Sequence, residues 1–214
     1  VRAALELANS SVTPAPLVTL TESVIRFAGH AAGQALARLS FDDAATQLDR
    51  ASIALDHVSP SRPFEKLETL IRLGECQALA RNPERRRAAL LKAAALARTL
   101  ERPGALARAA IAYCDLSEWS PHDPEAIPLL EAAIGGIDAG DPRLSAALET
   151  RLAYRYVRIE RERAQSLAHQ ALARARSAGD PHLVQEALYV LLFSLAGPDQ
   201  LAERAALREE IERS

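Results

Sequence analysis

The chain has 214 residues, of which 49% are hydrophobic and only 4% aromatic, and its net charge is −2. Ala and Leu dominate the hydrophobic share, and both favour helices over strands. The nearly balanced charge gives no reason to expect direct nucleic-acid binding. No apolar run reaches the ~20 residues that span a bilayer, and no signal-peptide pattern occurs. These features predict an all-α, cytoplasmic protein that has no membrane segment.

A tetrapeptide, Ala-Gly-Asp-Pro, occurs twice and ends at Pro142 and at Pro181. Pro63 and Pro103 continue the same spacing, so the period is about 39–40 residues, as in helical repeat arrays. In each copy we expect Gly to end one helix, Asp to cap the next, and Pro to occupy the first turn. The period predicts a right-handed superhelical solenoid of about five antiparallel helix pairs, which bury their apolar stripes by stacking.

Residues 1–20 are predicted to form the tail of a preceding helix and a loop, because Pro14 and Pro16 disfavour helix. Thr21 or Ser23 is expected to cap the first repeat helix. The helical-repeat domain then covers residues 21–214, with units near 21–62, 63–102, 103–140, 141–179 and 180–214. The sequence has no initiator Met and ends within a helical pattern, so we expect it to be a segment of a larger protein.

The second unit, 63–102, shows how its two helices should interlock. Leu73-Gly74 is followed by Leu90 and Ala93, a small-then-large spacing that lets two helix axes approach closely. Arg86 departs from this pattern, because a small residue is expected there. It belongs to a basic cluster around a turn, for which we expect a solvated face; the alternative is a contact with a phosphate or an acidic partner. The cluster consists of Arg81, Arg85, Arg86 and Arg87.

In the third unit, the loop 119–124 separates the two helices, and Pro128 keeps the second helix from starting much before Glu125. That helix is predicted to end with Gly140 as its C-cap. In the fourth unit, Arg151, Arg155 and Arg158 share one helix face with Glu160 and Glu162 nearby. This pattern predicts an exposed surface laced with ion pairs.

The units resemble degenerate tetratricopeptide (TPR) repeats, and one segment is more specific. Ala178 to Leu207 reads AGDPHLVQEALYVLLFSLAGPDQLAERAAL and resembles the helical-repeat region of large actinobacterial ATP-binding LuxR-type, MalT-like transcriptional regulators. Residues 27–29 and 35–45 are similar to an earlier part of that region. A departure is Ala196, where such proteins often carry a bulky aromatic residue. The resemblance covers nearly the whole chain from about residue 20.

In that family the repeats follow an ATPase module and often precede a DNA-binding helix-turn-helix. The present sequence has no phosphate-binding Gly-x-x-x-x-Gly-Lys-[Ser/Thr] loop, and no catalytic constellation. The five histidines lack metal-binding spacing, and Cys76 and Cys114 are expected to be buried thiols. We therefore expect no enzyme activity, cofactor or metal in this segment.

Candidate binding residues follow from the repeat register and from residue types that carry interface energy. In the register set by Leu152 and Ala153, side chains at 150, 154 and 158 point into the concave groove. The candidates are Tyr113, Trp119, Thr150, Tyr154 and Arg158. Tyr113 takes the comparable place one unit earlier, and Trp119 is either a lid over a helix end or a contact residue. Ordinary packing and solvation remain the alternative for all of them.

The expected function is a non-catalytic sensor or scaffold segment of a multidomain bacterial regulator, binding a protein partner or a small effector on its concave face. The alternative is a purely structural spacer or self-association module that couples an ATPase to an output domain. The two hypotheses differ in whether the concave face has a binding partner.

Overall fold

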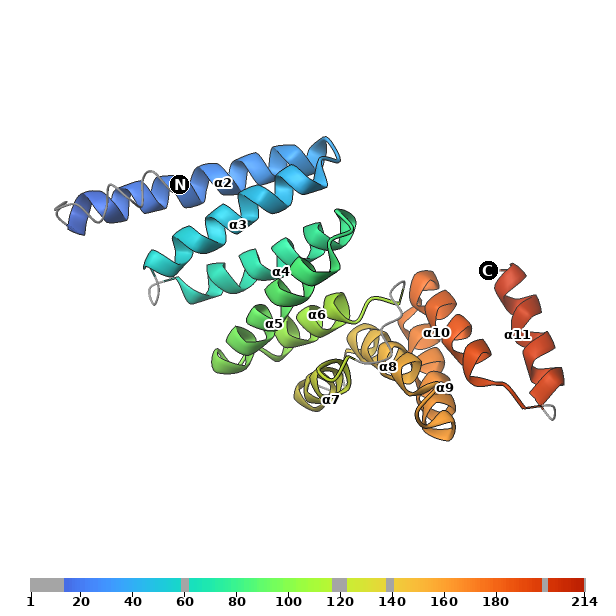
Figure 1. Ribbon diagram of the computed structural model, residues 1–214. Coiled ribbons are helices and arrows are strands. Elements are labelled where there is room, and N and C mark those ends of the chain that lie inside the picture. The colour runs from blue at the N-terminus through green and yellow to red at the C-terminus, as the bar shows by residue number, and fades with distance from the viewer. Residues whose placement is uncertain (1–13, 59–61, 117–122, 138–140, 198–199, 214) are drawn as a thin grey trace. The chain divides into compact units, whose positions relative to one another are not determined.

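The computed structural model describes residues 14–58, 62–116, 123–137, 141–197 and 200–213 (Figure 1). All regular secondary structure in these ranges is helical, which confirms the all-α prediction. The chain divides into two compact units, residues 1–105 and 106–214. None of the described helices is long and apolar enough to cross a membrane.

The first unit is a series of helices in which each contacts the next along the chain. The helices are α2 (Pro14–Ala37), α3 (Phe41–Val58), α4 (Pro63–Leu79) and α5 (Pro83–Thr99). Helix α3 packs against both α2 and α4, and α4 packs against α5 (Figure 1). Helix α6 (Pro103–Tyr113) crosses the boundary between the units. Contact between sequential neighbours is the arrangement that a helical repeat requires.

The start of α2 differs from the prediction, which placed a loop over Pro14 and Pro16. The helix begins at Pro14, so Thr21 and Ser23 lie inside it and not at its N-terminus. The hydroxyl of Ser23 donates instead to the carbonyl oxygen of Thr19, one turn earlier. Proline is tolerated in the first turn because the N–H groups there have no partner within the helix. The predicted helix tail before residue 14 lies outside the described residues.

Gly74 and Leu90 show how α4 and α5 interlock. A Cβ atom at Gly74 would lie 2.4 Å from Cγ of Leu90, far inside contact distance. Leu90 is fully buried, as are Ile71 and Ala93 at 0% exposure. The small-then-large pairing expected from the sequence is therefore confirmed. The absence of a side chain at Gly74 lets the two helices approach closely.

Arg86 corrects the expectation of a solvated basic face. Its side chain is 1% exposed, although Arg81 and Arg85 beside it are exposed. Position 86 lies on the inward face of α5, three and four residues before Ala89 and Leu90, which are also buried. Arg81, Arg85, Arg86 and Arg87 therefore do not form one solvated surface.

Several helices end with a residue in the left-handed region. Gly179 has φ 63° and closes α9, but Leu39, Arg81 and Glu101 take the same role with φ between 53° and 57°. The next residue donates back across the last turn, as from the Ser40 N–H to the Ala35 carbonyl at 2.9 Å. This hydrogen bond satisfies a carbonyl that would otherwise lack a partner. The positions of glycine in the sequence do not predict these three helix ends.

Among the described residues, the second unit contains most of α6 and five further helices. They are α7 (Ala126–Gly136), α8 (Pro142–Tyr156), α9 (Arg161–Ala178), α10 (Pro181–Ser194) and α11 (Leu201–Arg213). Helix α8 packs against α7, α9 and α10, while α10 also packs against α9 and α11. The apolar core of α8 to α11 includes Leu172, Leu188 and Leu191.

The Asp and Pro residues of both copies of the tetrapeptide have their predicted roles, and so does Gly179 of the second copy. Asp141 accepts from the N–H groups of Arg143 and Leu144 at 3.1 Å each, and Pro142 is the first residue of α8. Asp180 caps α10 in the same way. Helix α7 differs, because it ends at Gly136 with Ile137 as its cap. The predicted cap at Gly140 lies outside the described residues.

Candidate functional site

Two of the predicted groove residues are buried, so they cannot line an open surface. Tyr113 is 3% exposed, and its hydroxyl donates to Oδ1 of Asp123 at 3.0 Å. Thr150 is 0% exposed, and its hydroxyl donates to the carbonyl oxygen of Ala146 at 2.8 Å. Both side chains are packed inside the second unit. The expectation that they point into the groove is corrected by their burial.

The other predicted site residues have different surroundings. Tyr154 is half-buried and packs against the core of α8 to α11. Arg158 follows α8 and is exposed. Trp119 lies outside the described residues. The five candidates therefore do not form one surface in the described part of the chain, and Arg158 alone of the four described is open to solvent.

An exposed stripe on α10 occupies the positions that the sequence assigned to the groove. Tyr189 and Phe193 follow Thr150 and Tyr154 by the same interval that separates Asp141 from Asp180. Their exposed fractions are 44% and 63%.

His182 and Gln185 lie on the same face of α10 and are also exposed. Applying the register of α8 one unit later would have found this stripe, which the prediction omitted.

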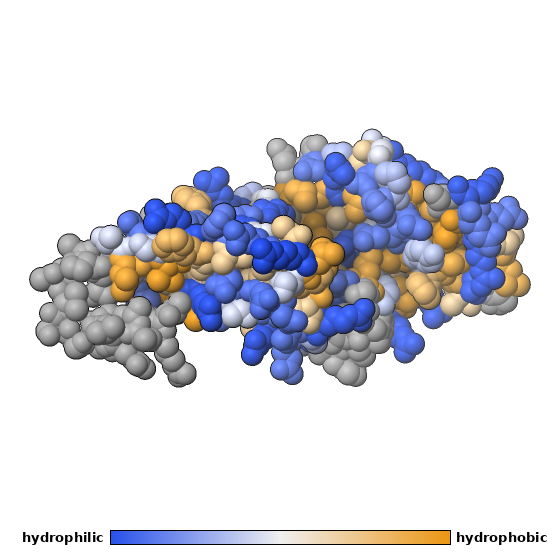
Figure 2. All heavy atoms as spheres, turned by 90° about the horizontal axis from the view of Figure 1, so that it is seen from above, coloured by the Kyte–Doolittle hydropathy of each residue, from blue (hydrophilic) through white to orange (hydrophobic). Residues whose placement is uncertain are grey.

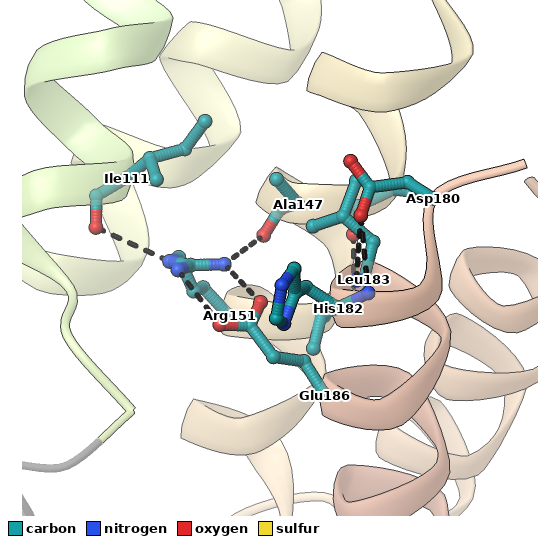
Figure 3. A network of polar contacts seen from close by, with 9 residues as sticks. Ile111, Ala147, Arg151, Asp180, His182, Leu183 and Glu186 are labelled. Atoms are coloured by element: carbon teal, nitrogen blue, oxygen red, sulfur yellow. Dashed lines mark hydrogen bonds and ion pairs between the residues drawn. The ribbon is translucent and has the colours of Figure 1, made fainter. Parts of the chain in front are cut away.

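Arg151 is the centre of a polar network that ties three helices of the second unit together (Figure 3). Its Nε donates to the carbonyl oxygen of Ile111 at 3.2 Å, and Nη1 donates to that of Ala147 at 3.1 Å. Nη1 also donates to Oε2 of Glu186 at 3.1 Å. Ile111 lies near the end of α6, where the last carbonyl groups have no partner within the helix. Arg151 thus caps α6 while it pairs with α10.

This network corrects the prediction of an exposed, ion-laced face on α8. The Arg151 side chain is only 11% exposed, and its carboxylate partner is Glu186 rather than Glu160 or Glu162. Arg155, one turn later, is 8% exposed. The planar guanidinium can donate several hydrogen bonds in fixed directions, which suits a junction of three helices. Of the three arginines, only Arg158 remains on the surface.

A second polar cluster lies where α7, α8 and α9 meet. The Tyr156 hydroxyl donates to Oε1 of Glu131 at 3.0 Å, and Nη2 of Arg163 donates to the same oxygen at 2.8 Å. The guanidinium of Arg163 also lies 4.2 Å from the centre of the Tyr156 ring. Burial raises the pKa of the Tyr156 phenol, and the hydrogen bond to Glu131 raises it further. The phenol therefore stays protonated at neutral pH and acts as a donor.

Cys114 is a buried thiol near the end of α6. Burial raises the pKa of the Cys114 thiol to about 11, while the nearby Arg155 lowers it by a smaller amount. A thiol with so high a pKa is a poor nucleophile at neutral pH. No group of three or more His, Cys, Asp or Glu residues in the described ranges could hold a metal ion.

The surface of the described residues mixes polar and apolar side chains. Figure 2 shows hydrophilic side chains over most of the visible face, with hydrophobic patches between them. The large apolar residues that remain exposed include Phe27, Phe64, Tyr189 and Phe193. Phe64 is covered in part by Arg102, whose guanidinium carbon lies 4.6 Å from the ring centre. Tyr189 and Phe193 stand out because they are one turn apart on a single helix.

Comparison with known proteins adds no assignment. No family model matches the chain, and no curated protein matches it significantly.

Proposed function

We propose that the chain is a non-catalytic, TPR-like segment of a multidomain bacterial transcriptional regulator. It binds a protein partner on the concave face of a right-handed superhelix, through the exposed face of α10. One observation carries the proposal: Tyr189 and Phe193 are both exposed, and they are four residues apart on this helix. Residues four apart lie one above the other on a helix and can enter the same partner surface.

Aromatic side chains are enriched at protein interfaces because they bury a large area with few rotatable bonds. Two such rings exposed on one helix therefore favour partner binding over ordinary solvation. The repeat register supports the concave face, since these positions follow Thr150 and Tyr154 by one period. Arg158, exposed after α8, is the predicted groove residue that remains a candidate contact.

The Arg151 network supports a rigid binding surface. Glu186 is three residues before Tyr189 on α10, and its carboxylate is fixed by Arg151 of α8. The backbone that carries the two aromatic rings is therefore held against α8. A preorganised surface loses less conformational entropy on binding than a mobile one.

The test is affinity capture from a lysate of the source organism, followed by identification of the captured proteins. The double variant Tyr189→Ala, Phe193→Ala should lose the partner that the wild-type chain captures. A matched control is Leu201→Ala, which removes an exposed apolar side chain (64% exposed) from α11. Capture that is unchanged in the double variant would refute the α10 assignment.

The spacer or self-association function predicts a different result. In that case the chain captures only itself or nothing, and sedimentation velocity shows whether it forms dimers. Tyr154 is unsuitable for the first test, because its ring packs against the core and its removal would destabilise the fold. Arg158→Ala avoids this problem and should weaken partner capture.

A further inference from the structure

A cavity in the first unit lies between α3, α4 and α5 and has a volume of about 380 Å³. Each helix contributes one stripe to its wall, with residues spaced three or four apart. The apolar part includes Leu70 and Leu73 of α4 and Ala89 of α5, which are all buried. A volume of this order suits a small organic molecule.

Two polar side chains in the wall have unused hydrogen-bonding capacity. Gln77 is 6% exposed and Ser52 is 7% exposed, and both line the cavity. Neither the Gln77 amide nor the Ser52 hydroxyl makes a hydrogen bond to another described residue. Neither residue is among those with a fully buried polar atom that lacks a partner, so the amide and the hydroxyl can be reached from the cavity. Each can therefore form a hydrogen bond with a ligand that occupies the cavity.

The charged residues of the cavity are arranged along its length. Arg85 and Lys92 of α5 both line it, about 10 Å apart along the axis at 1.5 Å per residue. Because α4 runs antiparallel to α3 and α5, Gln77 lies at the level of Arg85, and Ser52 at the level of Lys92. Each end of the cavity therefore combines one cation with one uncharged hydrogen-bonding group.

Asp49 of α3 lines the cavity at an intermediate level, opposite Leu73. Its carboxylate repels an anionic group held in the middle and favours a ligand whose charges are at its ends. No hydrogen bond or ion pair joins Asp49, Arg85 or Lys92 to another described residue. All three charges are thus available to a ligand.

We propose that this cavity binds an elongated organic dianion, with a carboxylate at each end and an apolar chain between them. One carboxylate binds Arg85 and the Gln77 amide, and the other binds Lys92 and the Ser52 hydroxyl. The apolar chain lies over Leu73. An extended chain of about eight carbons has a length similar to the separation of the two cations. This site lies in a different unit from α10 and does not depend on the proposed function.

The test is isothermal titration calorimetry of the full chain at low salt with three probes of equal length. They are suberate, octanoate and 1,8-diaminooctane, which carry two, one and no carboxylates. Suberate should bind about two- to fivefold more tightly than octanoate, the factor expected for one additional exposed ion pair. The diamine should not bind. Absence of suberate binding, equal affinity for octanoate, or binding of the diamine would each overturn the proposal.

Variants test the two ends separately. Arg85→Gln and Lys92→Gln should each lower the affinity for suberate to that for octanoate. Arg98→Gln, on the same helix but outside the cavity, should leave it unchanged.

The variant Gln77→Leu tests whether the Gln77 amide binds the ligand or stabilises the fold. It should weaken suberate binding while the thermal midpoint stays the same or rises, because an unpaired amide is removed. A lower midpoint with unchanged affinity would show that the amide stabilises the fold, and would overturn its role in binding.

Discussion

The contact between Gly74 and Leu90 predicts that a single methyl group at position 74 destabilises the first unit. In Gly74→Ala the new Cβ would lie 2.4 Å from Cγ and 2.5 Å from Cδ2 of Leu90. Ordinary carbon–carbon contacts are about 3.5–4.0 Å, so one helix or the Leu90 side chain must move by about 1 Å. Leu90 is fully buried and has little room to move.

Two effects of opposite sign set the magnitude. Overpacking a close-packed core costs about 1–3 kcal/mol. Replacing Gly by Ala within a helix gains about 1 kcal/mol from backbone entropy. Because the overlap is with the branched carbon of a buried side chain, overpacking should dominate. The difference between the two terms predicts that Gly74→Ala lowers the free energy of unfolding by up to about 2 kcal/mol.

Gly33→Ala is the matched control, because no atom lies within 4 Å of a Cβ placed there. Gly33 is inside α2 and belongs to the same compact unit as Gly74. This variant should raise the free energy of unfolding by up to about 1 kcal/mol. The same substitution should thus change the free energy of unfolding in opposite directions at the two positions. A general effect of Gly→Ala on helices cannot account for that result.

The assay is urea unfolding followed by circular dichroism, with the slope of each transition compared as well as its midpoint. A double-mutant cycle completes it: in the background of Leu90→Ala, the clash is absent and Gly74→Ala should no longer destabilise. If Gly74→Ala stabilises the protein as much as Gly33→Ala does, the close approach of α4 and α5 is wrong.

Three further predictions concern polar groups and thiols. Arg151→Ala should lower the free energy of unfolding by about 1.5–3 kcal/mol, because it removes charge-assisted hydrogen bonds. Glu186→Gln should lower it by less, since the bonds from Arg151 to α6 remain. Equal effects of the two variants in urea unfolding would contradict the role of Arg151 at the end of α6. The hydrogen bond from Arg143 holds the pKa of Asp180 below its ordinary value of 3.8. Above pH 3.8, Asp180→Ala should therefore have a lower thermal midpoint than the wild-type chain. The difference between the two midpoints should vanish as the pH falls through the lowered pKa. Burial raises the pKa of the Cys114 thiol, so iodoacetamide at pH 7.5 should label it only after denaturation; labelling of the native protein, measured by mass spectrometry, would contradict its burial.

Much of the fold could be predicted because short-range chemistry determines it. Proline at a helix start, aspartate as its cap and glycine at a helix end act within one turn of the chain. Asp141, Asp180 and Gly179 therefore have their predicted roles. The helix ends at Leu39 and Arg81 were not predictable in this way. There the left-handed residue is held by backbone hydrogen bonds and its side chain gives no signal.

The candidate site could not be predicted in full, because exposure depends on neighbouring helices. Thr150 and Tyr189 occupy equivalent positions of successive units, yet the first is fully buried and the second is 44% exposed. Helix α8 contacts α7, α9 and α10, whereas α10 contacts α8, α9 and α11. A periodic pattern assigns both residues to one face. It does not show which neighbour covers that face in each unit.

A sensor requires that ligand binding in one place alters binding in another, and the two proposed sites allow this to be measured. The cavity between α3, α4 and α5 lies in the first unit, while the exposed face of α10 lies in the second. If suberate changes the affinity for the partner by some factor, the partner must change the affinity for suberate by the same factor. In the absence of the partner, Tyr189→Ala, Phe193→Ala should leave suberate binding unchanged. Equal factors measured in both directions would establish coupling, whereas factors of one would make the two sites independent and the segment a scaffold.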